Sequence, residues 1–281
     1  TNIFDECPSL TTIYVPEGAA SNYIGEPWSN YDVQEINSRV LVDGLYYNVD
    51  LATKTAEVAK YEEGAPYSGD IVIPASISAY GLDFAVTAIE DFAFNRSVTL
   101  NSITIPNSVT YIGQEAFAFT GLTSVYIPAS VTNIVANPFR GCQDLVSIEV
   151  DSDNPVYDSS DNSNAIIETA TNTLLTGCQT TVIPSSVTTI GYVAFSDLEK
   201  LNTIGIPNSV TTIETAAFLF AGLTSAYIPA SVTSMVDNSF VCCQDLVSIE
   251  VDSENPVYDS RDNSNAIIET ATNSLITGCH T

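Results

Sequence analysis

The sequence offers few residues that could carry out chemistry, and most of them are carboxylates. Its 281 residues include 34 acidic and 7 basic side chains, a net charge of −27, and a single histidine, His280. A Ser-His-Asp or Cys-His arrangement is therefore disfavoured, because it needs a histidine placed beside the nucleophile. The remaining enzymatic hypothesis is a pair of carboxylates that cleaves glycans, for which the repeated Glu149 and Glu250 are the candidates.

Two acidic loops raise the alternative of a calcium site. The stretch "DSDNPVYDSSDN" places several hard oxygen donors close together, but it lacks the glycine-centred spacing and closing glutamate of an EF-hand loop. In the second copy of this loop Asp153 becomes Glu254 and Ser160 becomes Arg261, which weakens a shared site. A solvated turn is favoured over a metal site, whose candidate ligands are Asp151, Asp153, Asp158 and Asp161.

The six cysteines indicate packing rather than metal binding or disulfide stapling. Cys142 and Cys243 stand at matching positions of a repeat, as do Cys178 and Cys279. A free cysteine packs as a small apolar residue, and the sequence has no C-x-x-C and too few histidines for a zinc site. We therefore expect buried free thiols and no cofactor.

Two nested repeats supply the elements that hold these residues. The phrase "CQDLVSIEVDS" occurs twice, and a shift of 101 residues aligns residues 122–180 with 223–281, about four in five being identical. Within each copy a unit of 22 or 23 residues recurs, as in "ITIPNSVTYIGQEAFAFTGL" and "VYIPASVTNIVANPFRGCQDL". Its L-x-x-V-x-I alternation predicts a strand with one buried face, which the following proline ends. One unit cannot bury its own apolar side but stacked units can, so the pattern predicts a solenoid.

The template "IPNSVTxIxxxAF" closely resembles the BspA-type leucine-rich repeat of surface proteins from host-associated bacteria and some protists. The resemblance covers residues 71–281, and residues 7–31 are similar to a terminal unit. It implies a β-dominated, right-handed leucine-rich-repeat solenoid with short helical turns and inserted β-hairpins. It also implies export to the cell surface or secretion, and attachment to host proteins or other cells.

The net charge and the lengths of the apolar runs disfavour some classes of partner. The negative charge disfavours nucleic acid and anionic lipid surfaces. No apolar run approaches the ~20 residues that a membrane-spanning helix needs, and the first ten residues have no signal-peptide pattern.

The chain divides into segments of different character. We expect residues 1–38 to be the tail of a preceding repeat array and residues 39–70 to be a β-hairpin cap or linker. Residues 71–281 form the array, with a first module over 71–180 and a near-identical second module over 181–281. "AIIET" and "TLLTG" predict a hairpin inserted in the first module, and the second module repeats it. An array tail that precedes an array head suggests a piece of a longer repeat protein.

The middle residue of each V-x-I should face away from the core and contribute to a contact surface. Neighbouring strands lie ~4.8 Å apart, so Tyr126 should lie beside Glu149, and Tyr227 beside Glu250. Tyrosine is enriched at interfaces, although tyrosine and threonine also suit exposed strand positions that bind nothing. The expected binding residues are Tyr14, Thr104, Tyr126, Glu149, Tyr227 and Glu250.

The leading hypothesis is a non-enzymatic binding or adhesion module that engages a host extracellular-matrix protein, a glycan or another cell surface. One alternative is a passive spacer that displays another domain. The other is a carbohydrate-active enzyme, which requires two carboxylates within about 10 Å in a groove. The two repeated glutamates should lie ~19 Å apart, four coils from each other, which is too far for that reaction.

Overall fold

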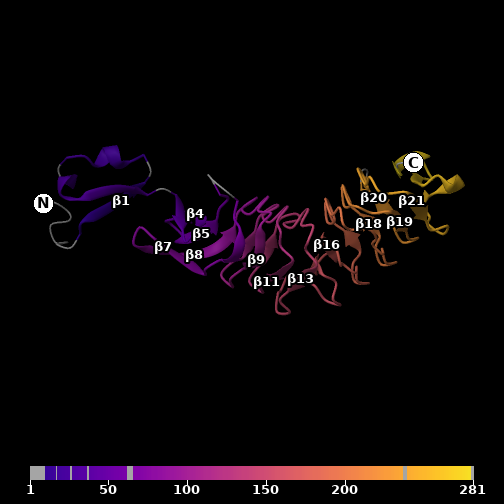
Figure 1. The fold of residues 1–281 in the computed structure, drawn as a ribbon, viewed down its shortest axis with the longest axis horizontal. Coiled ribbons are helices and arrows are strands. Elements are labelled where there is room, and N and C mark those ends of the chain that lie inside the picture. The colour runs from indigo at the N-terminus through magenta and orange to yellow at the C-terminus, as the bar shows by residue number, and fades with distance from the viewer. Residues whose placement is uncertain are drawn as a thin grey trace.

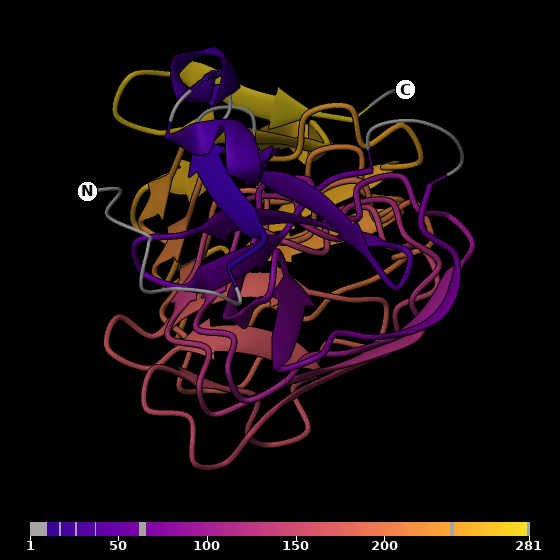
Figure 2. The ribbon, with the colours of Figure 1, turned by 90° about the vertical axis from the view of Figure 1, so that its left-hand side faces the viewer.

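The chain winds into coils that follow one another along the long axis of the molecule (Figure 1). In this computed structural model, residues 10–16, 18–25, 27–36, 38–61, 66–236 and 239–279 are described. Figure 2 looks along the stack and shows the coils one behind another. The fold is a β-dominated stack of coils, and its described helices are the short 3₁₀ turns η1 (Ala20–Tyr23), η2 (Trp28–Asn30) and η3 (Arg261–Asn263).

The L-x-x-V-x-I segments form a first column of parallel strands that is interrupted, since its pairs belong to four separate two-stranded sheets. Side chains alternate between core and solvent: in the strand over residues 124–127, Val125 and Ile127 are buried, whereas Ser124 and Tyr126 are exposed. Parallel pairing sets these segments side by side because each coil returns the chain to the same edge. The pairs are β1 (Thr12–Pro16) with β2 (Asp32–Ile36), β6 (Gly69–Val72) with β9 (Leu100–Thr104), β11 (Ser124–Ile127) with β13 (Ser147–Val150), and β19 (Ser225–Ile228) with β21 (Ser248–Val251).

The T-x-I segments form a second column of parallel strands. These strands are two residues long, apart from the first, because each coil turns again soon after the buried isoleucine or methionine. In the first module they are β8 (Leu82–Ile89), β10 (Tyr111–Ile112) and β12 (Asn133–Ile134). In the second module they are β17 (Thr189–Ile190), β18 (Thr212–Ile213) and β20 (Ser234–Met235).

For each module, one strand of a hairpin pairs in parallel with the first strand of this second column. Within residues 39–70, where a hairpin is expected, β4 (Leu45–Asp50) and β5 (Thr55–Val58) pair antiparallel, and β5 pairs in parallel with β8. Two further antiparallel strands, β3 (Arg39–Val42) and β7 (Ser76–Ala79), pair with β4 and β8. This group therefore covers the first edge of the array.

The inserted hairpins repeat this arrangement further along the chain. β15 (Ala165–Glu168) and β16 (Thr173–Gly177) pair antiparallel where the sequence predicts a hairpin, and β16 continues in parallel into β17. The second copy holds the corresponding β23 (Ala266–Glu269) and β24 (Ser274–Gly278). A two-residue strand joins each hairpin on its outer edge, β14 (Tyr157–Asp158) in the first and β22 (Tyr258–Asp259) in the second.

Stacked phenylalanine rings from the A-F turns run through the core. In the first module the rings of Phe94, Phe117 and Phe139 stack at centroid distances of 5.1 and 5.2 Å. The second module repeats the stack with Phe195, Phe218 and Phe240, at 5.2 and 4.8 Å. Offset aromatic stacking at such distances adds to the apolar burial of each ring.

Hairpin β15–β16 separates the cores of the two modules. Ile166 packs in the first core and its neighbour Ile167 in the second. Buried Asn137 links the modules, since its Nδ2 donates to the carbonyls of Val193 and Ala194 at 2.9 and 3.2 Å, and the Thr176 hydroxyl donates to its Oδ1 at 3.1 Å. The hairpin is thus both a partition and a contact surface between the arrays.

Within the described residues 66–236, two strands that the repeat template predicts do not form. Residues 181–183 and 204–206 carry no strand. Gly205 has no side chain to pack on a pleated surface, and glycine costs backbone entropy in a strand. The Thr181 hydroxyl instead bonds the segment to the hairpin: it donates to the Asn164 carbonyl and accepts from the Cys178 N–H, both at 2.7 Å.

Most of the expected buried thiols are confirmed. Cys142, Cys178 and Cys243 are buried and free, whereas Cys242 is exposed and Cys279 is partly buried. Burial raises the pKa of Cys142 and of Cys243 to about 11. Cys7 lies outside the described residues.

Candidate binding face

Two copies of a tyrosine–carboxylate cluster lie on the exposed face of the first column. In the first cluster Tyr126 of β11 lies directly opposite Glu149 of β13, as the repeat spacing predicts. The Tyr126 hydroxyl donates a hydrogen bond to Oδ2 of Asp151, at 2.6 Å, one residue beyond β13. Tyr126 nevertheless keeps 45% of its surface exposed, so its ring edge is available to a partner.

The second cluster reproduces the first. Tyr227 lies opposite Glu250, its hydroxyl donates to Oδ2 of Asp252 at 2.6 Å, and 46% of its surface is exposed. Figure 1 places the first cluster's strands near the middle of the stack and the second cluster's strands near its C-terminal end. The chain therefore presents the same chemical group twice, on two separate two-stranded sheets of the first column.

The hydrogen bond also shifts the pKa of the tyrosine and of the aspartate in each cluster. Its donation to Asp151 raises the pKa of Tyr126 to about 12 and lowers the pKa of the Asp151 carboxyl. Tyr227 and Asp252 are shifted in the same directions by the equivalent bond. At physiological pH each cluster thus holds a neutral tyrosine hydroxyl bonded to an ionised carboxylate.

A groove adjoins the first cluster, between β13 and the acidic loop that follows it. Its volume is about 750 Å³, and four carboxyl side chains line it. The loop is held by Asn154, whose Nδ2 donates to the carbonyls of Pro128 and Val131 at 3.0 and 2.9 Å. The carboxyl groups belong to Glu149, Asp151, Asp158 and Asp161.

Two of the four candidate calcium ligands, Asp151 and Asp158, already accept hydrogen bonds from the protein. Asp151 accepts from Tyr126 and, through Oδ1, from the Asp153 N–H at 2.9 Å. Asp158 Oδ1 accepts from the backbone N–H and the hydroxyl of Ser160, both at 3.2 Å. Across the described residues, no three His, Cys, Asp or Glu side chains are arranged to hold a metal ion.

Tyr14 and Thr104 lie apart from both clusters. Tyr14 is on β1 opposite Gln34, with its ring 5.4 Å from that of Tyr80. Thr104 is on β9 opposite Val72. Both side chains are exposed as expected, but neither meets a carboxylate of the clusters.

Asp151 and Asp252 are the cluster members that sequence reasoning did not assign to the binding face. The sequence analysis places Asp151 in the acidic loop as a candidate metal ligand. A usable signal was present, because each aspartate immediately follows a V-x-I strand adjacent to the strand of a tyrosine. A side chain at the strand end can reach the neighbouring strand's outward residue.

Comparison with known families now assigns the chain. The BspA-type leucine-rich-repeat region, described with six copies, matches residues 75–172 and 172–272. The chain belongs to the BspA-type leucine-rich-repeat family. No curated protein matches the sequence.

Several solved bacterial structures are similar in part. The pneumococcal vaccine antigen PcpA is 17% identical, with 79% of this chain and 83% of that chain covered and a TM-score of 0.46. A leucine-rich cell surface protein of Faecalibacterium prausnitzii is 24% identical with a TM-score of 0.42, and the match covers 84% of this chain but only 60% of that one. A leucine-rich-repeat protein of Bacteroides ovatus is 19% identical, at 76% and 71% coverage and a TM-score of 0.43. The family assignment rests on the sequence match to the repeat family.

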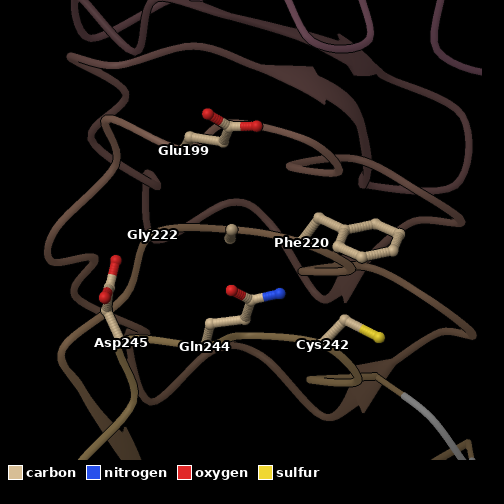
Figure 3. Close-up of a pocket in the computed structure, with 7 residues that line it drawn as sticks. Glu199, Phe220, Gly222, Cys242, Gln244 and Asp245 are labelled. Carbon is tan, nitrogen blue, oxygen red and sulfur yellow. The ribbon is translucent and has the colours of Figure 1, made fainter.

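A smaller pocket crosses three coils of the second module (Figure 3). Its volume is about 270 Å³, below the ~300–1,000 Å³ typical of small-molecule sites. Glu199, Gly222 and Asp245 lie one below another on successive coils, with Phe220 and Cys242 at the other end. The pocket brings no base beside the Cys242 sulfur, so we assign it no chemistry.

No helix among the described residues combines the length and the apolar character needed to cross a membrane.

Proposed function

We propose that this chain is a non-enzymatic binding and adhesion module of an exported bacterial surface protein. Its strand face engages a host extracellular-matrix protein, a glycan or another cell surface. The observation that carries the proposal is the duplication of the exposed tyrosine–carboxylate cluster, with a 2.6 Å hydrogen bond in both copies. We also propose that the coils wind in the right-handed sense that the family resemblance implies.

The geometry of each cluster suits recognition. Tyrosine supplies large contact area with little rotamer entropy to lose, and its hydroxyl is already oriented by an aspartate. The strands beneath it are fixed by parallel pairing and by the buried residues between them. Two equivalent clusters on one chain allow a partner with repeated sites to bind at both, which raises its apparent affinity.

The charge of the chain supports a neutral or cationic partner. With a net charge of −27, long-range repulsion opposes binding of nucleic acid and of anionic lipid headgroups. Neutral glycans and basic protein surfaces meet no such barrier, and basic surfaces gain a faster encounter rate from electrostatic steering.

The groove beside the first cluster gives the glycan-cleaving alternative its one structural argument, because several carboxyl groups line it. A glycosidase, however, needs a general acid whose pKa is raised, so that it holds a proton near neutral pH. The hydrogen bond from Tyr126 lowers the pKa of Asp151, which is the opposite direction. Asp151 is therefore disfavoured as the general acid of such a reaction.

The first test is a binding screen of the purified chain against immobilised matrix proteins, mucins and glycans, with calcium and with chelator. A Tyr126→Ala/Tyr227→Ala variant is compared with Tyr192→Ala, which removes another exposed tyrosine that lies outside both clusters. We expect saturable binding that the double variant weakens at least about tenfold while the control retains it. Absence of binding to every surface would favour the spacer, and release of polysaccharide fragments would favour the enzyme.

A further inference from the structure

The acidic loops of the two modules differ at one position that changes their charge. The residue two places after Asp158 is Ser160 in the first copy. In the second copy, the residue two places after the equivalent Asp259 is Arg261. Arg261 holds Asp259 with two contacts, Nε to Oδ1 at 2.8 Å and Nη2 to Oδ2 at 2.5 Å. Its Nη1 also donates to Oδ1 of Asn273 at 3.0 Å. In the second copy a guanidinium is thus held by one carboxylate and one side-chain amide, and it belongs to the loop's own arginine.

The first copy keeps both acceptors of that site. Asp158 and Asn172 occupy the positions of Asp259 and Asn273, and the two asparagines share a left-handed backbone conformation, with φ of 54° and 57°. Asp158 is also oriented in the same way: the N–H of residue 160 donates to its Oδ1 at 3.2 Å, against 3.3 Å in the second copy.

Neighbouring bonds in the two loops agree as well. The N–H of Val150 donates to the Ser159 hydroxyl at 2.8 Å, and in the second copy the N–H of Val251 donates to that of Ser260 at 3.1 Å. The bonds that position Asp259 are therefore also present in the first loop. The backbone of the first loop differs, however, at Asn162, which takes a φ of 53°, and at the 3₁₀ turn η3, which has no counterpart among the described residues of that loop.

Ser160 cannot do what Arg261 does. Its hydroxyl bonds to Asp158 Oδ1 at 3.2 Å, and its side chain is too short to extend to Asn172. Within the described part of the chain, no lysine or arginine forms an ion pair with Asp158. The first loop thus offers a guanidinium site without a guanidinium.

The surroundings of Asp158 favour a cation. Asp158 lines the 750 Å³ groove with Glu149, Asp151 and Asp161, and the described lining residues include no lysine or arginine. Converging carboxylates raise the local concentration of positive groups and speed their arrival. The groove also opens beside the first tyrosine–carboxylate cluster, since Glu149 and Asp151 belong to both.

We propose that Asp158 and Asn172 bind an arginine side chain from a basic segment of a partner protein, in the way that Asp259 and Asn273 bind Arg261. The proposal rests on the binding function proposed above and adds the chemistry of the partner. Arginine is preferred to lysine because its planar guanidinium offers two donors to one carboxylate and a third to the amide. The two modules are then unequal: the first has an open arginine site and the second a closed one.

The repeat supplies its own test variants. Ser160→Arg gives the first loop the residue of the second, and Arg261→Ser gives the second loop the residue of the first, so both changes use side chains already accommodated by the fold. Ala52→Arg adds the same charge in the exposed turn between β4 and β5 and serves as the charge control. The probe is a capped Gly-Gly-Arg-Gly-Gly peptide, compared with its lysine counterpart, titrated into ¹⁵N-labelled chain and followed by NMR.

In the unmodified chain we expect the arginine peptide to shift the Ser160 amide and the side-chain amide of Asn172. Ser160→Arg should abolish these shifts, Ala52→Arg should retain them, and Arg261→Ser should add shifts at residue 261 and Asn273. The lysine peptide should bind at least about fivefold more weakly, because it loses the bidentate geometry. Shifts that persist in Ser160→Arg, equal binding of the lysine peptide, or no shift at Ser160 would each overturn the proposal.

Failure of this proposal can be told from failure of the proposed function. If a captured partner is lost on substitution of Tyr126 and Tyr227 but is retained by Ser160→Arg, the strand face binds and the arginine site does not contribute. If the arginine peptide binds while no macromolecular partner is captured, the site exists but the adhesive function is contradicted.

Discussion

The hydrogen bond from the Tyr126 hydroxyl to Asp151 joins a residue in one coil to a residue just beyond the strand of the next. Both side chains lie on the outer surface of the sheet, so water competes with the bond and its contribution to folding is small. Its larger effect is to orient the tyrosine ring and to lower the pKa of the carboxyl. The same reasoning applies to Tyr227 and Asp252.

Replacement of Tyr126 by phenylalanine should raise the pKa of Asp151 toward its ordinary value of 3.8, because the bond that lowers it is removed. A carboxyl whose pKa is depressed in the folded state stabilises that state above its unfolded pKa and loses this contribution as pH falls through the folded pKa. Tyr126→Phe should therefore remove the share of that contribution that comes from the tyrosine hydroxyl, while the bond from the Asp153 N–H remains. The measurement is a ¹³C NMR titration of the side-chain carboxyls.

Asp252 in the same sample is the internal control for this titration, since its partner Tyr227 is unchanged. Its pKa should stay below the ordinary range while that of Asp151 moves. An unchanged pKa for Asp151 in Tyr126→Phe would show that the hydroxyl does not bond to it in solution.

The inserted hairpins are the elements that differ most in their surroundings. Hairpin β15–β16 lies between two packed modules, and a Cβ added at Gly177 would come within 2.1 Å of Cε1 of Phe195. The equivalent Gly278 in β24 has no such neighbour, and its nearest atom would be the Ala266 Cβ at 3.7 Å. Glycine at position 177 is thus required by packing against the next module.

Gly177→Ala should lower the free energy of unfolding by about 1–3 kcal/mol, because a methyl group is forced against a ring held in a stack. Gly278→Ala should change it by less than about 1 kcal/mol, and in the stabilising direction, because alanine loses less backbone entropy on folding. Equilibrium urea unfolding followed by circular dichroism compares the two. Equal effects of the two substitutions would contradict the described packing of β16 against Phe195.

Much of this element structure could be predicted, because the repeat itself carries the information. The register that sets Tyr126 beside Glu149 follows from the repeat spacing, and strands β4, β5, β15 and β16 follow from alternation and turn residues. The missing strand at 204–206 could not be predicted from the template, since it depends on Gly205 and on local packing. The bond between Tyr126 and Asp151 also escaped prediction, because it depends on how the chain leaves β13. The division into segments 1–38, 39–70 and 71–281 stays a prediction.

At the scale of the whole molecule, the stack is a long and strongly acidic scaffold that carries two equivalent clusters on two separate sheets. Each coil contacts mainly its neighbours, so the spacing of the clusters is set by the number of coils between them. A partner with matching repeats can engage both, whereas a small partner engages one. A binding module for extended surfaces should therefore bind repeated partners more tightly than single ones. A passive spacer should bind neither.

The most direct test of the binding face is hydroxyl-radical footprinting of the chain, free and bound to the strongest partner from the screen. Mass spectrometry then reports the reactivity of individual tyrosines. Our account predicts that Tyr126 and Tyr227 become protected in the complex, while Tyr192, which is 53% exposed outside the clusters, keeps its reactivity. Protection elsewhere, with Tyr126 and Tyr227 as reactive as in the free chain, would contradict the assignment of the strand face as the binding surface.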